Sequence, residues 1–272
     1  MNRFLTLILM GTLASFALVG CDDDKKPGGG NTPDASDDGD VPDSDVPDAE
    51  IPVETGVRVM HAASAFGAVD VFANDSFAAP VEGLTDLEYS TTALTKKLLE
   101  PGDYDLAIAA SDSTDPENEV LASRNGLGLA EGQFALVIAY GDDAEGGVGI
   151  AAYTDFGMTP GADEAVVRVF HGSETAGEVD ILLVGEEVSS ALISDFTPGE
   201  VQELAIPAAT ALTVGADVNN DGSADVTFDI PAALQAGAKA TAVVVNDNGV
   251  YKLLINIDGT DTVLAISMNE VV

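Results

Sequence analysis

An internal repeat limits the fold of this chain more than any other feature. Residues 57–71 reappear as residues 167–181 without a gap, and seven of the 15 aligned positions are identical. The chain has two histidines, His61 and His171, and they occupy equivalent positions. Self-similarity at a fixed offset indicates that one structural unit is used twice. We therefore expect two tandem domains, separated by the turn-forming cluster 159–161. The expected domain boundaries are 56–158 and 162–272.

Each copy is patterned as a series of short β-strands. Runs that alternate apolar and polar residues, or that are rich in Val and Ile, are separated by Gly, Pro, Asn and Asp at roughly 8–12-residue intervals. A sustained helical period is absent, although residues 231–237 could form one helical turn. This pattern predicts an all-β chain with two tandem Ig-like β-sandwich domains. The predicted strands are 57–61, 69–73, 94–99, 104–110, 133–140, 166–171, 179–184, 201–206, 224–230, 240–245 and 251–257.

The repeated residues resemble a known family. Val-Arg-Val-x-His, a Gly and Val-Asp-Val precede a Pro-Gly-x-Tyr sequence at 101–104. This pattern is similar to the family called domain of unknown function 4397 (DUF4397), and the resemblance extends from Gly56 to about Asp258. Such domains occur in secreted and surface-attached bacterial proteins, often in tandem, and look Ig-like. The resemblance implies a location and a fold but no activity, and the second copy departs from it at 208–210.

The first twenty residues have the order of an export signal. Arg3 precedes the apolar run 4–19, and Leu18-Val19-Gly20 leads into Cys21, the single cysteine of the chain. This order resembles the lipobox of bacterial lipoproteins, in which the cysteine is lipidated and becomes the N-terminus. The alternative is a transmembrane anchor, but a span needs roughly 20 apolar residues. We expect 1–20 to be a signal peptide, and the mature protein to be exported and attached to a membrane through lipidated Cys21, at the outer membrane or cell surface.

Residues 21–55 predict a disordered acidic tether. Between residues 22 and 55 there are twelve acidic residues and two lysines, together with recurrent Pro and a Gly-Gly-Gly run. Low hydrophobicity, like-charge repulsion and proline oppose a packed core. The segment is therefore expected to be a spacer between the lipid anchor and the first domain.

The charge of the whole chain excludes one class of partner. Its 272 residues include 47 Asp and Glu against 10 Lys and Arg, for a net charge of −37, while 46% of the residues are apolar. Nucleic-acid binding requires clustered basic residues, so no nucleic-acid partner is expected. The apolar fraction is too high for a disordered acidic polymer, which indicates folded domains.

Three polar residues recur in both copies. In the first copy, strand alternation places Arg58 and Met60 on the face opposite His61. If the two strands are neighbours, Arg58 could pair with Asp70. A catalytic histidine would need an adjacent nucleophile, but neither copy contains Gly-x-Ser-x-Gly. We interpret these residues as structural. Their counterparts in the second copy are Arg168, His171 and Asp180.

The clearest candidate site is the loop 217–225. It offers oxygen ligands at loop positions 1, 3, 5, 7 and 9, with Gly222 at position 6 for a sharp turn, which suits Ca²⁺. It resembles loops that connect β-strands in extracellular calcium-binding proteins. An EF-hand is not supported, because Phe228 stands where the bidentate Glu is required. The alternative is a hairpin turn without an ion. The candidate ligands are Asp217, Asn219, Asp221, the Ser223 carbonyl and Asp225.

Two functions remain open from the sequence. The favoured one is a non-catalytic lipoprotein of the cell envelope, presenting two Ig-like domains for adhesion or for an unknown protein or glycan partner, with calcium as a stabilising ion. The alternative is an extracytoplasmic calcium-dependent hydrolase that acts on polysaccharide or peptide through carboxylates. The missing nucleophile motif and the absence of Trp favour the first function. No cofactor other than Ca²⁺ is expected.

Overall fold

A computed structural model describes residues 54–74, 76–89, 94–142, 147–185 and 189–270. The predicted signal peptide, Cys21 and the tether up to residue 53 lie outside these described residues. Residues 51–272 form one compact unit. Its described secondary structure consists of β-strands. Among the described residues, no helix has the length and apolar character needed to cross a membrane.

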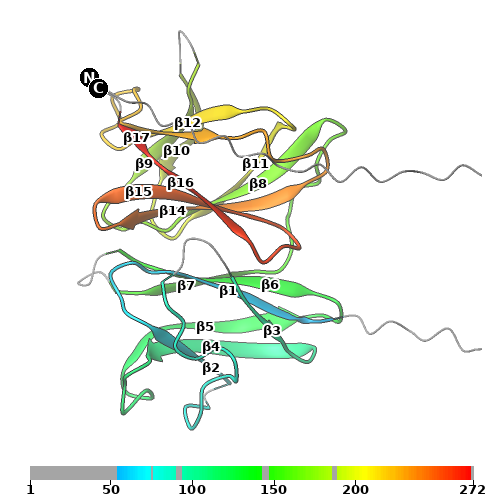
Figure 1. Ribbon diagram of the computed structural model, residues 1–272, viewed down its shortest axis with the longest axis vertical. Helices are drawn as coiled ribbons and strands as arrows, with labels where there is room; N and C mark the ends of the chain where they lie inside the picture. The colour runs from blue at the N-terminus through cyan, green and yellow to red at the C-terminus, as the bar shows by residue number, and fades with distance from the viewer. Residues whose placement is uncertain (1–53, 75, 90–93, 143–146, 186–188, 271–272) are drawn as a thin grey trace, which may run out of the picture. The chain divides into compact units, whose positions relative to one another are not determined.

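The first copy of the repeat folds into two sheets, the first sandwich (Figure 1). Its inner sheet has the order β3-β1-β6-β7 and its outer sheet the order β2-β4-β5. Strand β1 is central, because it pairs antiparallel with β3 and parallel with β6. The strands are β1 (Gly56–Ala62), β2 (Val69–Ala73), β3 (Thr95–Leu98), β4 (Gly102–Ala110), β5 (Val120–Leu129), β6 (Phe134–Tyr140) and β7 (Gly149–Tyr153).

The second copy repeats this arrangement as the second sandwich. Its inner sheet has the order β11-β8-β14-β15-β16 and its outer sheet the order β10-β9-β12-β13-β17. Strand β8 pairs antiparallel with β11 and parallel with β14, as β1 does with its neighbours. The strands are β8 (Glu164–His171), β9 (Val179–Leu183), β10 (Ser190–Phe196), β11 (Val201–Pro207), β12 (Leu212–Asp217), β13 (Val226–Ile230), β14 (Lys239–Asp247), β15 (Val250–Ile257), β16 (Val263–Ser267) and β17 (Asn269–Glu270).

The predicted all-β class is confirmed, and the sheets pack as β-sandwiches. The Ig-like part of the prediction is not confirmed. In an immunoglobulin constant domain the first two strands belong to the same sheet. Here β1 and β2 lie in opposite sheets, as do β8 and β9. Instead, β1 lies between β3 and the parallel strand β6, and β8 lies between β11 and the parallel strand β14.

The strand predictions succeed where alternation is clear. Strand β2 has the predicted bounds, and the other ten predicted strands differ from the observed ones by one or two residues at one or both ends. The observed strands that were not predicted are β5, β7, β10, β12, β16 and β17. In β5 the central residues 123–126 are polar or Gly and exposed, so no apolar face marks the strand. Residues 231–237 form turns and not the suggested helical turn.

Each sandwich has its own core between its two sheets. In the first, Val57 and Val59 of β1 pack against Ile108 of β4. In the second, Val167 and Val169 of β8 occupy the equivalent positions. Full burial of a side chain of this size contributes about 1.5–3 kcal/mol. The alternation read from the sequence therefore assigns the inward face of these strands correctly.

A third apolar cluster joins the two sandwiches. Met60 and Phe170, which are equivalent in the repeat, are both fully buried in it, together with Ile138, Val243 and Leu254. These residues lie on the outward faces of the two inner sheets, so the inner sheets pack on each other. Figure 1 shows the four sheets as successive layers. Both inner sheets are consequently covered on both faces, which explains why β1 and β8 are almost entirely buried.

Candidate functional site

Each histidine closes the loop that follows its strand. The Nε2 atom of His61 lies 2.9 Å from the carbonyl oxygen of Gly67, and the backbone N–H of Ala63 points to Nδ1 at 3.3 Å. Because a carbonyl can only accept, Nε2 carries the proton and Nδ1 accepts. His171 makes the same two contacts, with Gly177 at 2.8 Å and Ser173 at 3.3 Å. Both ring nitrogens of each histidine are thus engaged by the backbone.

Burial also fixes the charge of the two rings. It lowers the pKa of both His61 and His171, with the carbonyl of Gly67 or Gly177 opposing the shift. A buried imidazole that both donates to and accepts from the backbone is neutral, and protonation would break the Nδ1 contact. These contacts agree with the interpretation of both histidines as structural residues.

The two repeated aspartates have a role that the sequence did not indicate. Asp70 accepts a hydrogen bond of 2.8 Å from the backbone N–H of Asp86, and Asp180 accepts one of 2.8 Å from Asp195. Asp86 and Asp195 have φ values of 50° and 53°, in the left-handed region. Asp tolerates this conformation better than most residues, and the accepting carboxylate satisfies the exposed N–H. The predicted pairs of these aspartates with arginine are wrong, because arginine and aspartate lie in different sheets.

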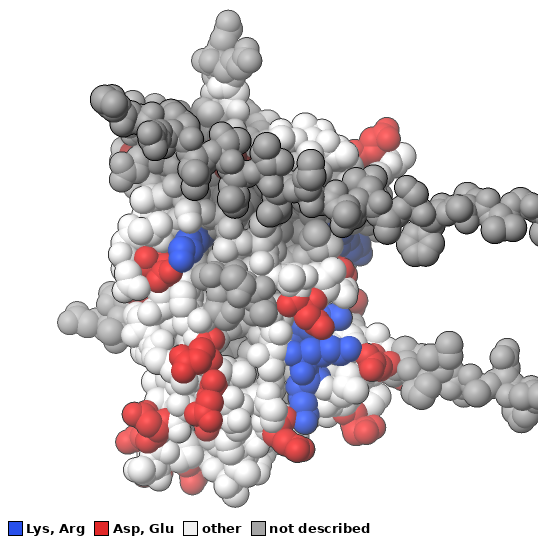
Figure 2. Space-filling model, viewed as in Figure 1, with Lys and Arg blue, Asp and Glu red and all other residues white. Residues whose placement is uncertain are grey.

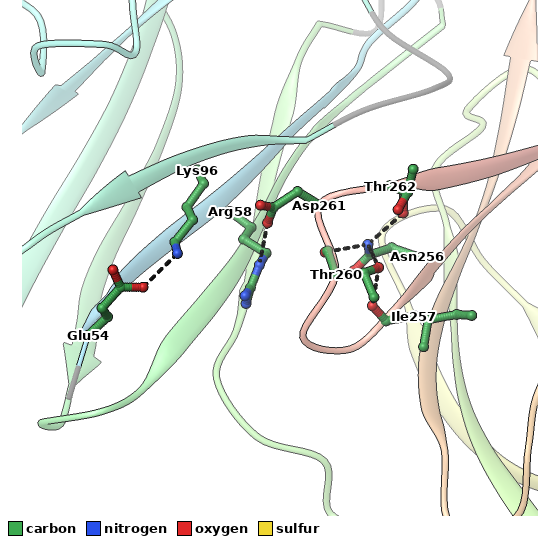
Figure 3. A network of polar contacts seen from close by, with 8 residues as sticks. All are labelled: Glu54, Arg58, Lys96, Asn256, Ile257, Thr260, Asp261 and Thr262. Carbon is green, nitrogen blue, oxygen red and sulfur yellow. Dashed lines mark hydrogen bonds and ion pairs between the residues drawn. The ribbon is translucent and has the colours of Figure 1, made fainter. Parts of the chain in front are cut away.

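Arg58 contacts the second sandwich instead. Its Nε atom lies 2.9 Å from Oδ1 of Asp261, in the turn between β15 and β16 (Figure 3). The guanidinium carbon also lies 4.4 Å from the centre of the Phe134 ring, within the range of a cation–π contact. Asn256 shapes the turn that carries Asp261, because its Nδ2 donates to the carbonyl oxygens of Thr260 and Thr262 at 3.0 and 2.9 Å.

Arg168, the repeat counterpart of Arg58, is more deeply buried than Arg58. Its Nη2 atom lies 2.8 Å from Oε1 of Glu203, and it also donates to the carbonyl oxygen of Asp155 in the segment between the sandwiches. The guanidinium carbon lies 4.2 and 4.7 Å from the ring centres of Phe156 and Tyr153. Arg168 therefore ties the connecting segment to the inner sheet of the second sandwich.

Glu203 receives several donors at once. Its carboxylate accepts hydrogen bonds from Met158 N at 2.7 Å and Gly157 N at 3.2 Å, besides those from Arg168. Burial acts to raise the pKa of Glu203, but the N–H of Met158, Arg168 and the N–H of Gly157 together hold it below its ordinary value. Glu203 is accordingly an ionised structural residue that anchors the connecting segment.

A second polar contact joins the sandwiches near the histidine loops. Asp142, after β6, accepts hydrogen bonds from the backbone N–H groups of Glu174 and Thr175 at 2.8 and 3.0 Å, and from the hydroxyl of Ser173. In the opposite direction, the hydroxyl of Ser64 donates to the carbonyl oxygen of Asn246. The loop after His61 thus contacts the end of β14 in the second sandwich, and the loop after His171 contacts the residue that follows β6 in the first.

The candidate calcium loop connects β12 and β13, of which the sequence predicted the strand after the loop but not the bounds of the strand before it. Asp217 is fully buried, and its carboxylate accepts hydrogen bonds from Gly222 N at 2.7 Å, Asn219 N at 3.2 Å and Asp221 N at 3.3 Å. Asp225 accepts from Asn219 Nδ2 at 3.0 Å. The five candidate ligands therefore belong to one closed turn.

The hydrogen bonds within the loop do not decide whether it binds calcium. The carboxylates of Asp217 and Asp225 hold the turn through N–H donors, which is also what a turn without an ion would use. Within the described ranges, no three His, Cys, Asp or Glu side chains are grouped so as to hold a metal ion. Calcium binding by this loop therefore remains a prediction.

Part of the chain matches a known protein family. Residues 55–182 match a family model described as domain of unknown function (DUF4397). The matched range contains the whole first sandwich, together with β8 and most of β9. The predicted resemblance is confirmed over this range, and its extension to about Asp258 stays a prediction. No curated protein matches the chain.

Proposed function

We propose that this chain, with the DUF4397 match over residues 55–182, is a non-enzymatic protein of the cell envelope that presents a fused pair of β-sandwiches to an external partner. The observation that carries this proposal is the shared apolar cluster around Met60 and Phe170. It makes the two sandwiches one body, as suits a display module at the end of a tether. Lipidation at Cys21 and the acidic tether supply the attachment.

The histidine contacts support the non-enzymatic part of the proposal. A general base needs a ring nitrogen free to take a proton from a nucleophile. In both His61 and His171 the two ring nitrogens are already bound to the backbone. No contact among the described residues specifically favours the alternative, a carboxylate-based hydrolase, and the experiment below tests both.

The outer sheets are the surfaces left for a partner. The inner sheets are covered on both faces, whereas β5 of the first outer sheet exposes most of its residues. Acidic side chains are spread over the visible surface, while basic ones gather in a few groups (Figure 2). Charge complementarity therefore favours a protein partner with a basic surface, or a glycan bridged by divalent cations.

The anchoring is tested by labelling cells that express the full chain with palmitate. We expect label in the wild type and none in Cys21→Ala, and release of the folded body when external protease cleaves the tether on intact cells. A chain that carries no label and stays in the cytoplasm contradicts the proposal. Turnover of a polysaccharide or peptide by the purified mature chain, lost on substitution of particular carboxylates, supports the hydrolase instead.

A further inference from the structure

An apolar cavity of about 210 Å³ lies between the two sheets of the second sandwich. Strands of both sheets contribute to its walls, and every lining residue is apolar. Native cores contain few voids larger than a water molecule. A cavity of roughly 150 Å³ with such walls stays dry and binds benzene or xenon. The size and the lining therefore suit an apolar guest and not a cluster of water molecules.

The lining of the cavity is more exposed at one end of the sandwich than at the other. Ala216 and Phe228, at the inner end, are 5% and 2% exposed. Leu212 and Ile230, where β12 begins and β13 ends, are half-buried, and Pro207 at the end of β11 is exposed. A guest that enters at this end crosses neither sheet, although it must pass the turn 231–237, whose Leu234 is buried and accepts a hydrogen bond from Ala209 N at 2.7 Å.

The first sandwich shows what would fill this space. The pairing of Phe72 with Ala107, and of Leu182 with Gly215, aligns β4 with β12. By this alignment Ile108, a buried core residue of the first sandwich, corresponds to Ala216. The second core thus has a methyl group where the first has a branched four-carbon side chain.

Three further positions follow the same trend. On the strands just aligned, Tyr104 corresponds to Leu212 and Leu106 to Val214. Val137 corresponds to Ala242, because Val137 pairs with Val59 and Ala242 pairs with Val169, the repeat counterpart of Val59. Three positions change in the opposite direction, from Val71 to Ile181, from Ala73 to Leu183 and from Ala139 to Val244, and they compensate only in part. The cavity therefore arises from particular substitutions between two copies of one fold.

The shape of the cavity selects the kind of guest. Its lining on β12 extends from Leu212 to Ala216, which is about 13 Å along a strand at roughly 3.3 Å per residue. The two sheets of a sandwich lie about 10 Å apart, so the space is long and narrow. An aliphatic chain fits such a space better than a planar ring does.

Charge selects the head group. The cavity has no basic side chain in its lining, and the chain carries a net charge of −37. An anionic head group would meet repulsion at the mouth and no counter-charge. We propose that the second sandwich binds one uncharged amphiphile through its aliphatic chain, which enters beside Leu212 and leaves the head group in solvent. This site does not depend on the proposed display function.

The test is a titration of the methyl-labelled mature chain with 1-octanol, followed by NMR. We expect saturable shifts at methyl groups of Ile181, Leu212 and Val244, and no comparable shifts at Ile108 or Val71 in the first core. Octanoate should bind at least tenfold more weakly. Shifts that do not saturate, that are equal in both sandwiches, or that are matched by octanoate overturn the proposal, as does saturable binding of benzene without 1-octanol.

Variants test the position of the site. Ala216→Ile restores the residue of the first core, and should weaken 1-octanol binding at least tenfold. Thr227→Val, a change of similar shape on β13 outside the cavity lining, should leave binding unchanged. If Ala216→Ile loses the dispersion of folded methyl signals, Ala242→Val, which restores the residue found at 137, takes its place. Unchanged binding in the folded cavity-filling variant overturns the proposal.

Discussion

Arg58 of the first sandwich pairs with Asp261 of the second, at 2.9 Å between Nε and Oδ1. Asp261 is about half exposed, with 52% of its side-chain surface accessible. An ion pair that is open to solvent contributes about 0–1 kcal/mol, and salt screens it. The pair therefore fixes the orientation of one turn against the first sandwich more than it stabilises the interface.

Asp261→Ala should accordingly lower the free energy of unfolding by about 1 kcal/mol or less. Because the loss is electrostatic, it should shrink further in high salt. Urea unfolding of the wild type and the variant at low and high ionic strength measures both effects. A loss of several kcal/mol that is unaffected by salt would mean that Asp261 does more than pair with Arg58.

Phe170→Ala should be far more damaging. Phe170 is fully buried in the cluster between the sandwiches and contacts the Tyr140 ring edge-to-face at 4.8 Å between centroids. Truncation of a buried Phe costs about 3–5 kcal/mol. We expect calorimetry to show a lower melting temperature and two separate transitions, because the sandwiches lose their shared core. Phe72→Ala, outside this cluster, is the control that should keep the transitions coupled.

Glu203→Ala should lower the free energy of unfolding by about 2 kcal/mol. This is less than the roughly 3–5 kcal/mol lost when a fully buried ion pair is broken, because Glu203 keeps some contact with solvent. The substitution leaves the buried guanidinium of Arg168 without its carboxylate. The double variant Arg168→Met with Glu203→Met should recover much of this loss. Chemical unfolding of the single and double variants measures the coupling, and strictly additive losses would contradict it.

The two histidines predict a loss of stability in mild acid. Their pKa values lie below the ordinary value in the folded chain and near 6.5 in the unfolded chain. The stabilisation is complete above about pH 6.5, and is lost as the pH falls towards the folded pKa, because the unfolded state takes up the protons first. Unfolding titrations between about pH 7 and 5.5 should show this slope, and His61→Gln with His171→Gln should flatten it.

Calcium should raise the melting temperature if the loop 217–225 binds it. At a free concentration one hundred times the dissociation constant, the added stability is about 2.7 kcal/mol. Calorimetry with millimolar Ca²⁺ or with EDTA measures the shift, and Asp221→Ala should abolish it while the chain stays folded. Identical melting curves in Ca²⁺ and EDTA would remove the predicted site.

The alternation of residues predicted correctly which face of a strand each side chain lies on, but it did not predict which strands lie next to each other. It correctly placed Arg58 and Met60 opposite His61, since the side-chain period of a strand is a local property. It could not show which strand lies alongside, and the predicted pairing of Arg58 with Asp70 failed for this reason. The face of β1 that carries Arg58 and Met60 forms the interface, and its burial depends on the second sandwich, whose Asp261 lies 203 residues after Arg58.

Site prediction was limited in the same way. The loop 217–225 was located together with the strand that follows it, because ligand spacing and turn residues are local. The cavity depends on how Ala216 and Ala242, from opposite sheets, compare with the residues of the other copy. That comparison requires strand registers, and the sequence repeat between residues 57–71 and 167–181 does not extend far enough to supply them.

The central position of β1 also has a mechanical consequence. The described chain enters β1 at Gly56, and β1 is hydrogen-bonded on both sides, to β3 and along its full length to β6. A pull on the N-terminus along the strand axis loads these bonds together in shear and does not open them one by one. If the chain is held by its N-terminus, as proposed, and flow or a bound particle drags on the sandwiches, the first element to bear the load is the strand best placed to resist it.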